Sequence, residues 1–327
     1  MVVRDLGLVW KGPDQYGVEA IAAPANRPGW VEVDVAYAGI CGSDLHICAG
    51  HHSRARVGIV LGHEFVGRLA QAAAGHAAGQ PVFVNPMIAC GNCDACARGL
   101  VNVCQRLTAI GVDFPGAIAR RLSVPEANLF PLPPDADLAR FALTEPLAVC
   151  VRALKRTDVQ RGTKVRVVGA GPIGVLLALL AQHRGADVEL LEPAQWRRSQ
   201  AEALGLTSVA ERAADQWADV VFDAAGHPSV SPRLTGWTRP GGSVVIVGAY
   251  APGEHPFNLL AVNFAELTII GTRIYTEGDI DEAIALLDQT DIFDPIITSR
   301  VALTQAADAI SALKRAEGLK VLIEVAP

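Results

Sequence analysis

The sequence contains no hydrophobic run long enough to cross a membrane. Its longest apolar stretch within a helical pattern, residues 175–181, ends at Gln182, well short of the roughly 20 residues that a membrane-spanning helix needs. It also has no run of lysine or arginine. With 28 basic against 34 acidic residues, the net charge is -6, which offers a phosphate backbone little to bind. We therefore expect neither a membrane nor a nucleic acid as a partner.

A secretory signal and a disulfide framework are also missing. The first apolar stretch is short, has charges on both sides and precedes no small-residue cleavage site, so we expect a cytoplasmic location. The seven cysteines are an odd number, and four of them fall within fifteen positions. Both facts favour thiolate chemistry in a reducing compartment. At 327 residues, half of them apolar, the chain is long enough for two domains.

The first part of the chain, up to about residue 150, is typical of an antiparallel β domain. Short β-like runs at residues 31–36, 65–69, 82–85 and 120–124 alternate with turn residues. Runs of this length and spacing predict a mainly antiparallel domain of short strands.

After residue 150 the pattern changes to strands that alternate with helices. The expected strands are 165–168, 188–191, 220–223 and 243–247, and the expected helices are 173–184 and 196–204. This alternation predicts βαβ units and a doubly wound parallel sheet of the Rossmann type. The tail indicates helix, helix and strand at 280–287, 306–314 and 321–325. Periodicity alone does not assign the tail to a domain.

The strongest chemical signal is the cluster of Cys90, Cys93 and Cys96, followed by Cys104. Two-residue gaps let a tight turn aim successive thiolates at one point, and four thiolates complete a closed tetrahedral shell around zinc. A closed shell leaves no position for a substrate, so this zinc would be structural. The alternatives are buried thiols, a redox pair or an iron–sulfur cluster.

A second constellation is dispersed along the chain. Cys41 lies in the segment GICGSDLH, His63 and Glu64 in GHE, and Glu145 in TEP. A thiolate, an imidazole and carboxylates can form a zinc site with one open position, which catalysis requires. Taken singly, each has another explanation: a small core cysteine, a core or surface histidine, or a glutamate that caps a helix.

A glycine-rich turn follows the expected strand at 165–168 and precedes an expected helix. In this context the pattern G-x-G-x-x-G is typical of a site where backbone N–H groups at a helix N-terminus bind the pyrophosphate of a dinucleotide. The candidate binding residues of the turn are Gly169, Gly171, Pro172, Ile173 and Gly174.

The preferred dinucleotide is predicted from an acidic residue further on. Glu192 closes the second strand, 18 residues after Gly174, where its carboxylate can accept hydrogen bonds from the adenosine ribose. A carboxylate there repels the 2′-phosphate of NADP, so NAD is favoured. Arg197 and Arg198 lie close by and could accommodate that phosphate.

Taken in this order, the motifs resemble the zinc-dependent medium-chain dehydrogenase/reductase family. The resemblance runs from GICGSDLH through GHEFVG, CGNCDAC and GAGPIG to KVLIE at 320–324. The segment TEPLA at 144–148 is similar to the branch of sorbitol, threonine and butanediol dehydrogenases. The resemblance implies a partly open antiparallel β-barrel catalytic domain of residues 1–150 and 277–327. It also implies a Rossmann domain of residues 151–276.

The resemblance also implies roles for the candidate residues. Cys41, His63 and Glu64 would surround a catalytic zinc, with Glu145 either a direct ligand or held through a water. Ser43 and His46 match the proton-relay positions of the family. The remaining matches are to positions that contact the dinucleotide: Ile173, Glu192, Arg197, Val247, Gly248, Ala249, Thr272 and Arg273.

The expected function is therefore that of a zinc-dependent alcohol dehydrogenase. It would transfer hydride between NAD and a secondary alcohol on a small polar substrate: a polyol, a sugar, an amino-cyclitol or a hydroxy amino acid. Two zinc ions per chain and a homodimer or homotetramer are implied. The alternatives are a non-catalytic dinucleotide-binding structural or regulatory protein and a zinc-free enone or quinone reductase. Cys48 and Cys150 have no assigned role, and His51 and His52 are either exposed loop residues or substrate contacts.

Overall fold

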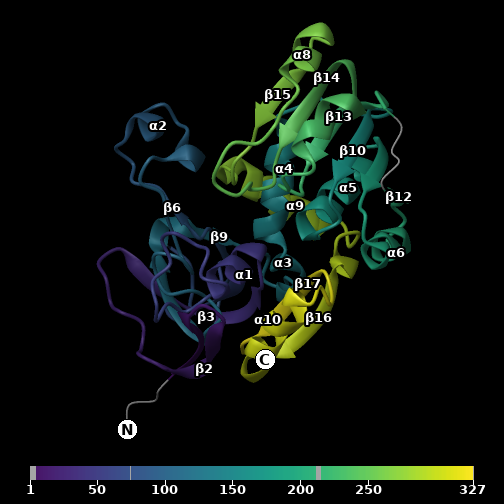
Figure 1. Cartoon of the computed structure of the whole chain (residues 1–327). Helices are drawn as coiled ribbons and strands as arrows, with labels where there is room; N and C mark the ends of the chain where they lie inside the picture. Colours follow the sequence, from purple (N-terminus) through teal and green to yellow (C-terminus); the bar gives the residue numbers. More distant parts are fainter. Residues whose placement is uncertain (1–4, 74, 211–214, 327) are drawn as a thin grey trace. The chain divides into compact units, whose positions relative to one another are not determined.

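The computed structural model describes residues 5–73, 75–210 and 215–326, and the chain forms two compact units (Figure 1). Unit 1 is Met1–Glu145 with Ile284–Pro327, and unit 2 is Pro146–Ala283. Both limits between the units fall inside helices, α4 (Thr144–Lys155) and α9 (Glu277–Gln289). Among the described residues, no helix is both long and apolar enough to cross a bilayer.

Unit 1 is built on a seven-stranded sheet in which all pairs are antiparallel except β16 with β17. The path runs β16-β17-β3-β4-β5-β9, and β8 also pairs with β3, so the described strands do not close into a complete barrel. The strands are β3 (Trp30–Gly39), β4 (Glu64–Leu69), β5 (Pro81–Val84), β8 (Arg121–Pro125), β9 (Leu129–Pro131), β16 (Ile297–Ala302) and β17 (Lys320–Glu324).

The central strand of this sheet shows why it forms. In the first part of β3, Val31, Val33 and Val35 are buried and alternate with less buried residues, the period expected for a strand with one face on the core. The other elements of unit 1 are smaller. They include the hairpin β1 (Asp5–Gly12) and β2 (Gln15–Ile21), and the helices α1 (Gly42–Cys48), α3 (Leu138–Phe141) and α10 (Ala306–Lys314).

A lobe projects from the sheet of unit 1 between two short strands, β6 (Met87–Ile88) and β7 (Thr108–Ala109) (Figure 1). The strands pair antiparallel and so close the base of the lobe. The lobe contains α2 (Asp94–Ala97) and the 3₁₀ turn Val101–Val103.

Unit 2 is a six-stranded sheet in which every pair is parallel, in the order β12-β11-β10-β13-β14-β15. The strands are β10 (Lys164–Val168), β11 (Asp187–Leu191), β12 (Thr207–Val209), β13 (Ala218–Asp223), β14 (Thr238–Ile246) and β15 (Thr268–Gly271). Helices α5 (Pro172–His183), α6 (Gln195–Ala203), α7 (Leu234–Trp237) and α8 (Leu259–Phe264) connect them. The predicted fold class is confirmed, and the strand order reverses at β10, where open α/β sheets bind ligands.

The tail differs from the predicted helix, helix and strand in one respect. A further strand, β16, lies between α9 and α10. In this edge strand, intermediate residues alternate with exposed ones, so its sequence ITSRVA lacks the strong apolar signal of a buried strand.

Candidate metal and dinucleotide sites

The first candidate site is organised by the start of α1. Cys41 is the N-cap of this helix, and the Asp44 carboxylate accepts a hydrogen bond from the Cys41 backbone N–H at 2.9 Å. The other oxygen of Asp44 accepts from the Gly62 N–H at 3.2 Å. Asp44 is fully buried. Through these two hydrogen bonds it links the chain segments that carry Cys41 and His63.

Three of the predicted metal ligands meet at this point. One ligand atom each from Cys41, His63 and Glu64 lies within 4.8 Å of the other two. His63 and Glu64 are buried, and the Ser43 hydroxyl is 3.2 Å from Nε2 of His63. A sulfur, an imidazole nitrogen and a carboxylate oxygen at this spacing fit a zinc ion.

The imidazole of His63 is held electrostatically from behind. Its Nδ1 lies 3.7 Å from Oδ1 of Asp44. Burial lowers the pKa of His63, but the charges of Asp44 and Cys41 outweigh burial and raise the pKa well above its ordinary value. A carboxylate behind a ligating histidine fixes the ring orientation and makes the ring a better ligand.

Glu64 is paired with a buried lysine to which the sequence analysis gave no role. Nζ of Lys320, in β17, lies 2.6 Å from Oε2 of Glu64 and 3.1 Å from the Ile40 carbonyl. Burial lowers the pKa of Lys320, but the charges of Glu64 and then Cys41 outweigh burial. They raise the pKa above its ordinary value, so the ammonium stays charged. Gly39 leaves room for the pair, because a Cβ there would lie 2.4 Å from the Glu64 carboxylate. The available signal was a lysine directly before three apolar residues of a buried strand, Val321, Leu322 and Ile323.

The other predicted residues of this site are placed differently. Glu145 is buried in the first turn of α4 and is not part of the three-residue group, although its charge reaches Lys320. His46 is exposed in the last turn of α1, one helical turn after Ser43. Ser43 and His46 therefore lie on the same face of the helix.

The four cysteines of the lobe form a second group in which one sulfur from each lies within 4.8 Å of the others. The Cys93 and Cys96 sulfurs are 3.5 Å apart, as are those of Cys104 and Cys90. The Asn92 backbone N–H and then Arg106 lower the pKa of Cys90 to about 6. Four sulfurs at this spacing fit a closed zinc site rather than disulfides.

The predicted dinucleotide residues lie at the carboxyl ends of the strands of unit 2. A pocket of about 440 Å³ brings together Gly169, Gly171, Glu192 and Arg197. Pro172 begins α5 and Gly171 is its N-cap, so the first N–H groups of this helix are available to an anion. The pocket also includes His227, which the sequence analysis missed.

The remaining predicted contacts follow β14 and β15. Thr272 and Arg273 come directly after β15. After β14, the N–H groups of Val247 and Gly248 donate to the backbone carbonyl of Asp223, at the end of β13. Ala249 follows them and is exposed. Tyr250, which was not predicted from the sequence, donates its hydroxyl hydrogen to the Asp223 carboxylate at 2.6 Å.

Comparison with known proteins gives two family matches. Residues 27–134 match the alcohol dehydrogenase GroES-like domain, and residues 172–289 match the zinc-binding dehydrogenase family. The chain is 35% identical to 2-dehydro-3-deoxy-L-galactonate 5-dehydrogenase of Pseudoalteromonas atlantica, over 96% of each chain. It is 29% identical to sorbitol dehydrogenase of Halalkalibacterium halodurans, over 95% of this chain and 96% of that one.

Among solved structures, the chain is similar to a putative zinc-binding dehydrogenase from Sinorhizobium meliloti 1021 bound to NADP. The TM-score is 0.91 and the sequence identity 30%, and the match covers 98% of this chain and 99% of the other. The similarity therefore extends over both units rather than over a single one.

Proposed function

Because the chain belongs to the zinc-type medium-chain dehydrogenase family, we propose that it oxidises a secondary alcohol of a polyol or acidic sugar and reduces a nicotinamide dinucleotide. The observation that carries this proposal is the group of Cys41, His63 and Glu64 with the Ser43 hydroxyl beside it. We assign the metal chemistry to unit 1 and dinucleotide binding to unit 2.

A zinc ion in this group would act as a Lewis acid that lowers the pKa of the substrate hydroxyl. The protein side chains have separate tasks. Ser43 accepts the substrate proton and passes it on, and the exposed His46, on the same face of α1, releases it to water. Asp44 orients His63, and Lys320 holds Glu64 in place.

The proposal is tested by measuring metal content together with cofactor reduction. We expect zinc in the purified protein and an increase in NADH absorbance with secondary alcohols from a panel of polyols and acidic sugars. Zinc without turnover of any alcohol would favour a non-catalytic dinucleotide-binding protein. Turnover of enones by metal-free protein would favour a zinc-free reductase.

We propose that the four cysteines of the lobe hold a second, structural zinc. Replacing Cys93, which is buried, with alanine removes one thiolate, so we expect zinc to fall from two ions to one per chain. The melting temperature should fall by several degrees, because metal binding to such a lobe also stabilises its fold. Metal analysis and thermal unfolding measure both effects.

Cys48→Ala is the matched control, because burial raises the pKa of Cys48 to about 12 and keeps it a thiol outside both groups. This variant should keep two zinc ions. A Cys93→Ala protein that still holds two would contradict the assignment.

We propose NAD rather than NADP as the dinucleotide. The Glu192 carboxylate is buried and is fixed by the N–H groups of Ala170 and Ala194, each at 2.9 Å, so its charge faces the pocket. Arg198 is committed to the backbone carbonyls of Glu192 and Pro193 at 2.8 and 2.7 Å. A 2′-phosphate would therefore meet a fixed negative charge. The solved relative from Sinorhizobium meliloti, in contrast, is bound to NADP.

Replacing Glu192 with glutamine removes that charge with little change of shape. We expect the ratio of kcat/KM for NAD to that for NADP to fall roughly tenfold or more, since a hydrogen bond to a charged acceptor is lost and a repulsion is relieved. Steady-state kinetics with both cofactors measure the ratio. Glu202→Gln, an exposed change on α6, should leave it unaltered. An unchanged ratio in Glu192→Gln would oppose this role.

We propose that the protein forms dimers or tetramers through the edge of the sheet in unit 2. Ile269 in the edge strand β15 is exposed. In α8, the side chains of Leu259, Leu260 and Phe264 are each 67% to 80% exposed. An apolar patch beside an unpaired strand edge favours contact with another chain. Sedimentation should therefore give at least twice the chain mass of 34.4 kDa, and a monomer would contradict this.

Because thiolate ligands must stay reduced, the cytoplasm is the location we propose.

A further inference from the structure

A pocket of about 700 Å³ in unit 1 is lined by charged and hydroxyl side chains that the proposed chemistry does not use. Its walls come from residues 53–59 and 108–114. The polar lining consists of Ser53, Arg54, Arg56, Thr108 and Asp113.

Both walls are attached to the segments that carry the proposed catalytic group. The first wall follows α1, and the His51 N–H donates to the carbonyl of His46 at 2.9 Å. In the second wall, Gly111 has a φ of +80° and lies so close to Gly62 that a Cβ would be 2.5 Å from the Gly62 carbonyl. His63 follows Gly62 directly. Both walls of the pocket are therefore held by backbone contacts to the segments that carry His46 and His63.

His52 fixes the backbone of the first wall. Burial lowers the pKa of His52 and the charge of Arg54 lowers it further, while Asp113 acts in the opposite direction. The neutral ring accepts the N–H groups of Arg54 and Ala55 at Nδ1, each at 3.3 Å, which fixes the backbone that carries Arg54.

The Arg54 side chain is held in one orientation, but only some of its N–H donors are used. Its Nη1 donates to the Leu107 carbonyl at 2.5 Å and lies 3.2 Å from the Asp113 carboxylate. Both contacts with described residues use Nη1, which leaves the Nε and Nη2 hydrogens for a ligand. A guanidinium that presents such a pair of donors matches the two oxygens of a carboxylate.

Arg56 supplies charge that no neighbour balances. In the described part of the chain its side chain makes no hydrogen bond or ion pair, and it is exposed. Asp113 offsets the charge of Arg54, so one positive charge remains in the pocket. An anion with a single negative charge would complete the balance.

We propose that this pocket binds the carboxylate of an acidic sugar substrate, with Arg56 supplying the charge and Arg54 the oriented donors. The inference rests on the proposed function and narrows its substrate class, because it selects aldonates over alditols. Ser53 provides a hydroxyl for the sugar chain, and the Thr108 hydroxyl, which donates to the Ile88 carbonyl at 3.3 Å, can accept a hydrogen bond from it.

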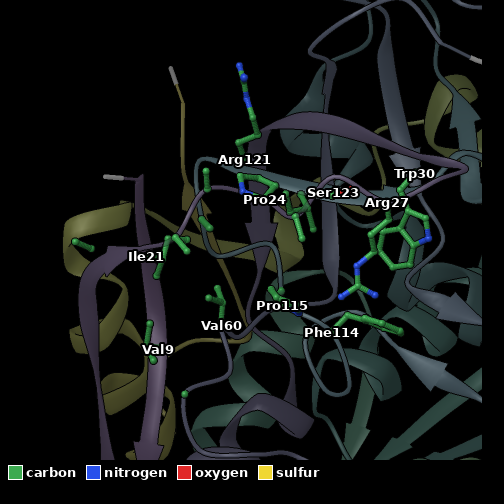
Figure 2. Close-up of a pocket in the computed structure, with 18 of the residues that line it drawn as sticks. Val9, Ile21, Pro24, Arg27, Trp30, Val60, Phe114, Pro115, Arg121 and Ser123 are labelled. Atoms are coloured by element: carbon green, nitrogen blue, oxygen red, sulfur yellow. The ribbon is translucent and has the colours of Figure 1, made fainter. Parts of the chain in front are cut away.

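A neighbouring pocket in unit 1 contains Arg27 and Arg121, and Arg27 serves as the internal comparison (Figure 2). There the guanidinium of Arg27 lies 5.0 Å from the ring of Trp30 and 5.1 Å from that of Phe114. Phe114 lines both pockets, so Arg27 carries the same charge beside an aromatic ring that the two pockets share.

The experiment compares substrates that differ only in the carboxylate. L-galactonate is paired with galactitol and D-gluconate with sorbitol, and kcat and KM are measured at saturating NAD. The proteins are the zinc-loaded wild type, Arg56→Gln, Arg54→Gln and the matched control Arg27→Gln. Calorimetric titration of the NADH complex with each aldonate gives a binding constant that does not depend on turnover.

We expect Arg56→Gln to lower kcat/KM for the aldonates roughly 10- to 100-fold, mainly through KM, as for the loss of a hydrogen bond to a charged group. The alditols should change less than about twofold, since they lack the charge that Arg56 would bind. Calorimetry should show the same loss of aldonate binding. Arg54→Gln should act in the same direction, and Arg27→Gln should match the wild type.

Three results would overturn the inference while leaving the proposed function intact. They are oxidation of alditols with no preference for aldonates, an equal loss for both substrates in Arg56→Gln, or an equal loss of aldonate binding in Arg27→Gln. Failure of the zinc-loaded wild type to oxidise any alcohol would instead remove the proposed function, and the inference with it.

Discussion

Replacing Cys41 with serine should lower kcat by at least about a thousandfold, since a metal that acts as a Lewis acid contributes several kcal/mol to such reactions. A serine hydroxyl does not ionise at neutral pH and is a poor replacement for a thiolate, so the three-residue group should lose its zinc. Zinc content should fall from two ions to one per chain. Turnover is followed by NADH absorbance and zinc by metal analysis.

The same variant should still bind the dinucleotide, because Cys41 is in unit 1 and the glycine turn is in unit 2. NADH fluorescence titration should give a Kd close to that of the wild type. Cys150→Ser is the control, since this buried cysteine belongs to neither metal group. Full turnover by the Cys41→Ser protein would contradict the assignment of a catalytic metal to this site.

The second large effect is expected from two alanine substitutions in the glycine turn. A Cβ at Gly174 would lie 1.8 Å from the backbone carbonyl of Gly169, so Gly174→Ala forces the turn to open. A Cβ at Gly171 meets nothing within 4 Å, and its φ of −74° is ordinary for any residue. That Cβ would instead occupy the space where a pyrophosphate must approach the backbone.

Gly174→Ala should therefore lower both the melting temperature and dinucleotide affinity, whereas Gly171→Ala should weaken affinity roughly tenfold or more and leave the melting temperature unchanged. NADH titration and thermal unfolding of the cofactor-free protein separate the two effects. Both variants should keep two zinc ions, which serves as the control for unit 1. Wild-type affinity in Gly171→Ala would mean that the pyrophosphate does not approach this backbone.

Local signals predicted most of unit 2. The strand before the glycine turn was expected at 165–168 and lies at Lys164–Val168, and the following helix was expected at 173–184 and lies at Pro172–His183. Both were predictable because a compact β-branched run, a glycine turn and a proline at the helix start are all local features. The carboxyl ends of parallel strands then bring Gly169 and Glu192 into one pocket.

Unit 1 was less predictable because its pairings are not local. Its short strands were expected near their observed positions, but nothing in their sequences indicates that β3 pairs with β4, β8 and β17. The Lys320–Glu64 pair joins residues 256 positions apart, so no sequence window contains both. The domain limits near residues 150 and 277 stay predictions. The unit limits fall within helices, where composition does not change.

The position of Lys320 in β17 also sets an order in time. Glu64 and Lys320 are separated by the whole of unit 2, and at about 5–20 residues per second the ribosome needs roughly 13–50 s to make the chain between them. During that time the Glu64 carboxylate has no ammonium partner, and β3 lacks its neighbour β17. Unit 2 is synthesised in full within the same interval. Unit 2, which lies between the two segments of unit 1 in the sequence, can therefore fold first. The group of Cys41, His63 and Glu64 acquires the buried charge of Lys320 last.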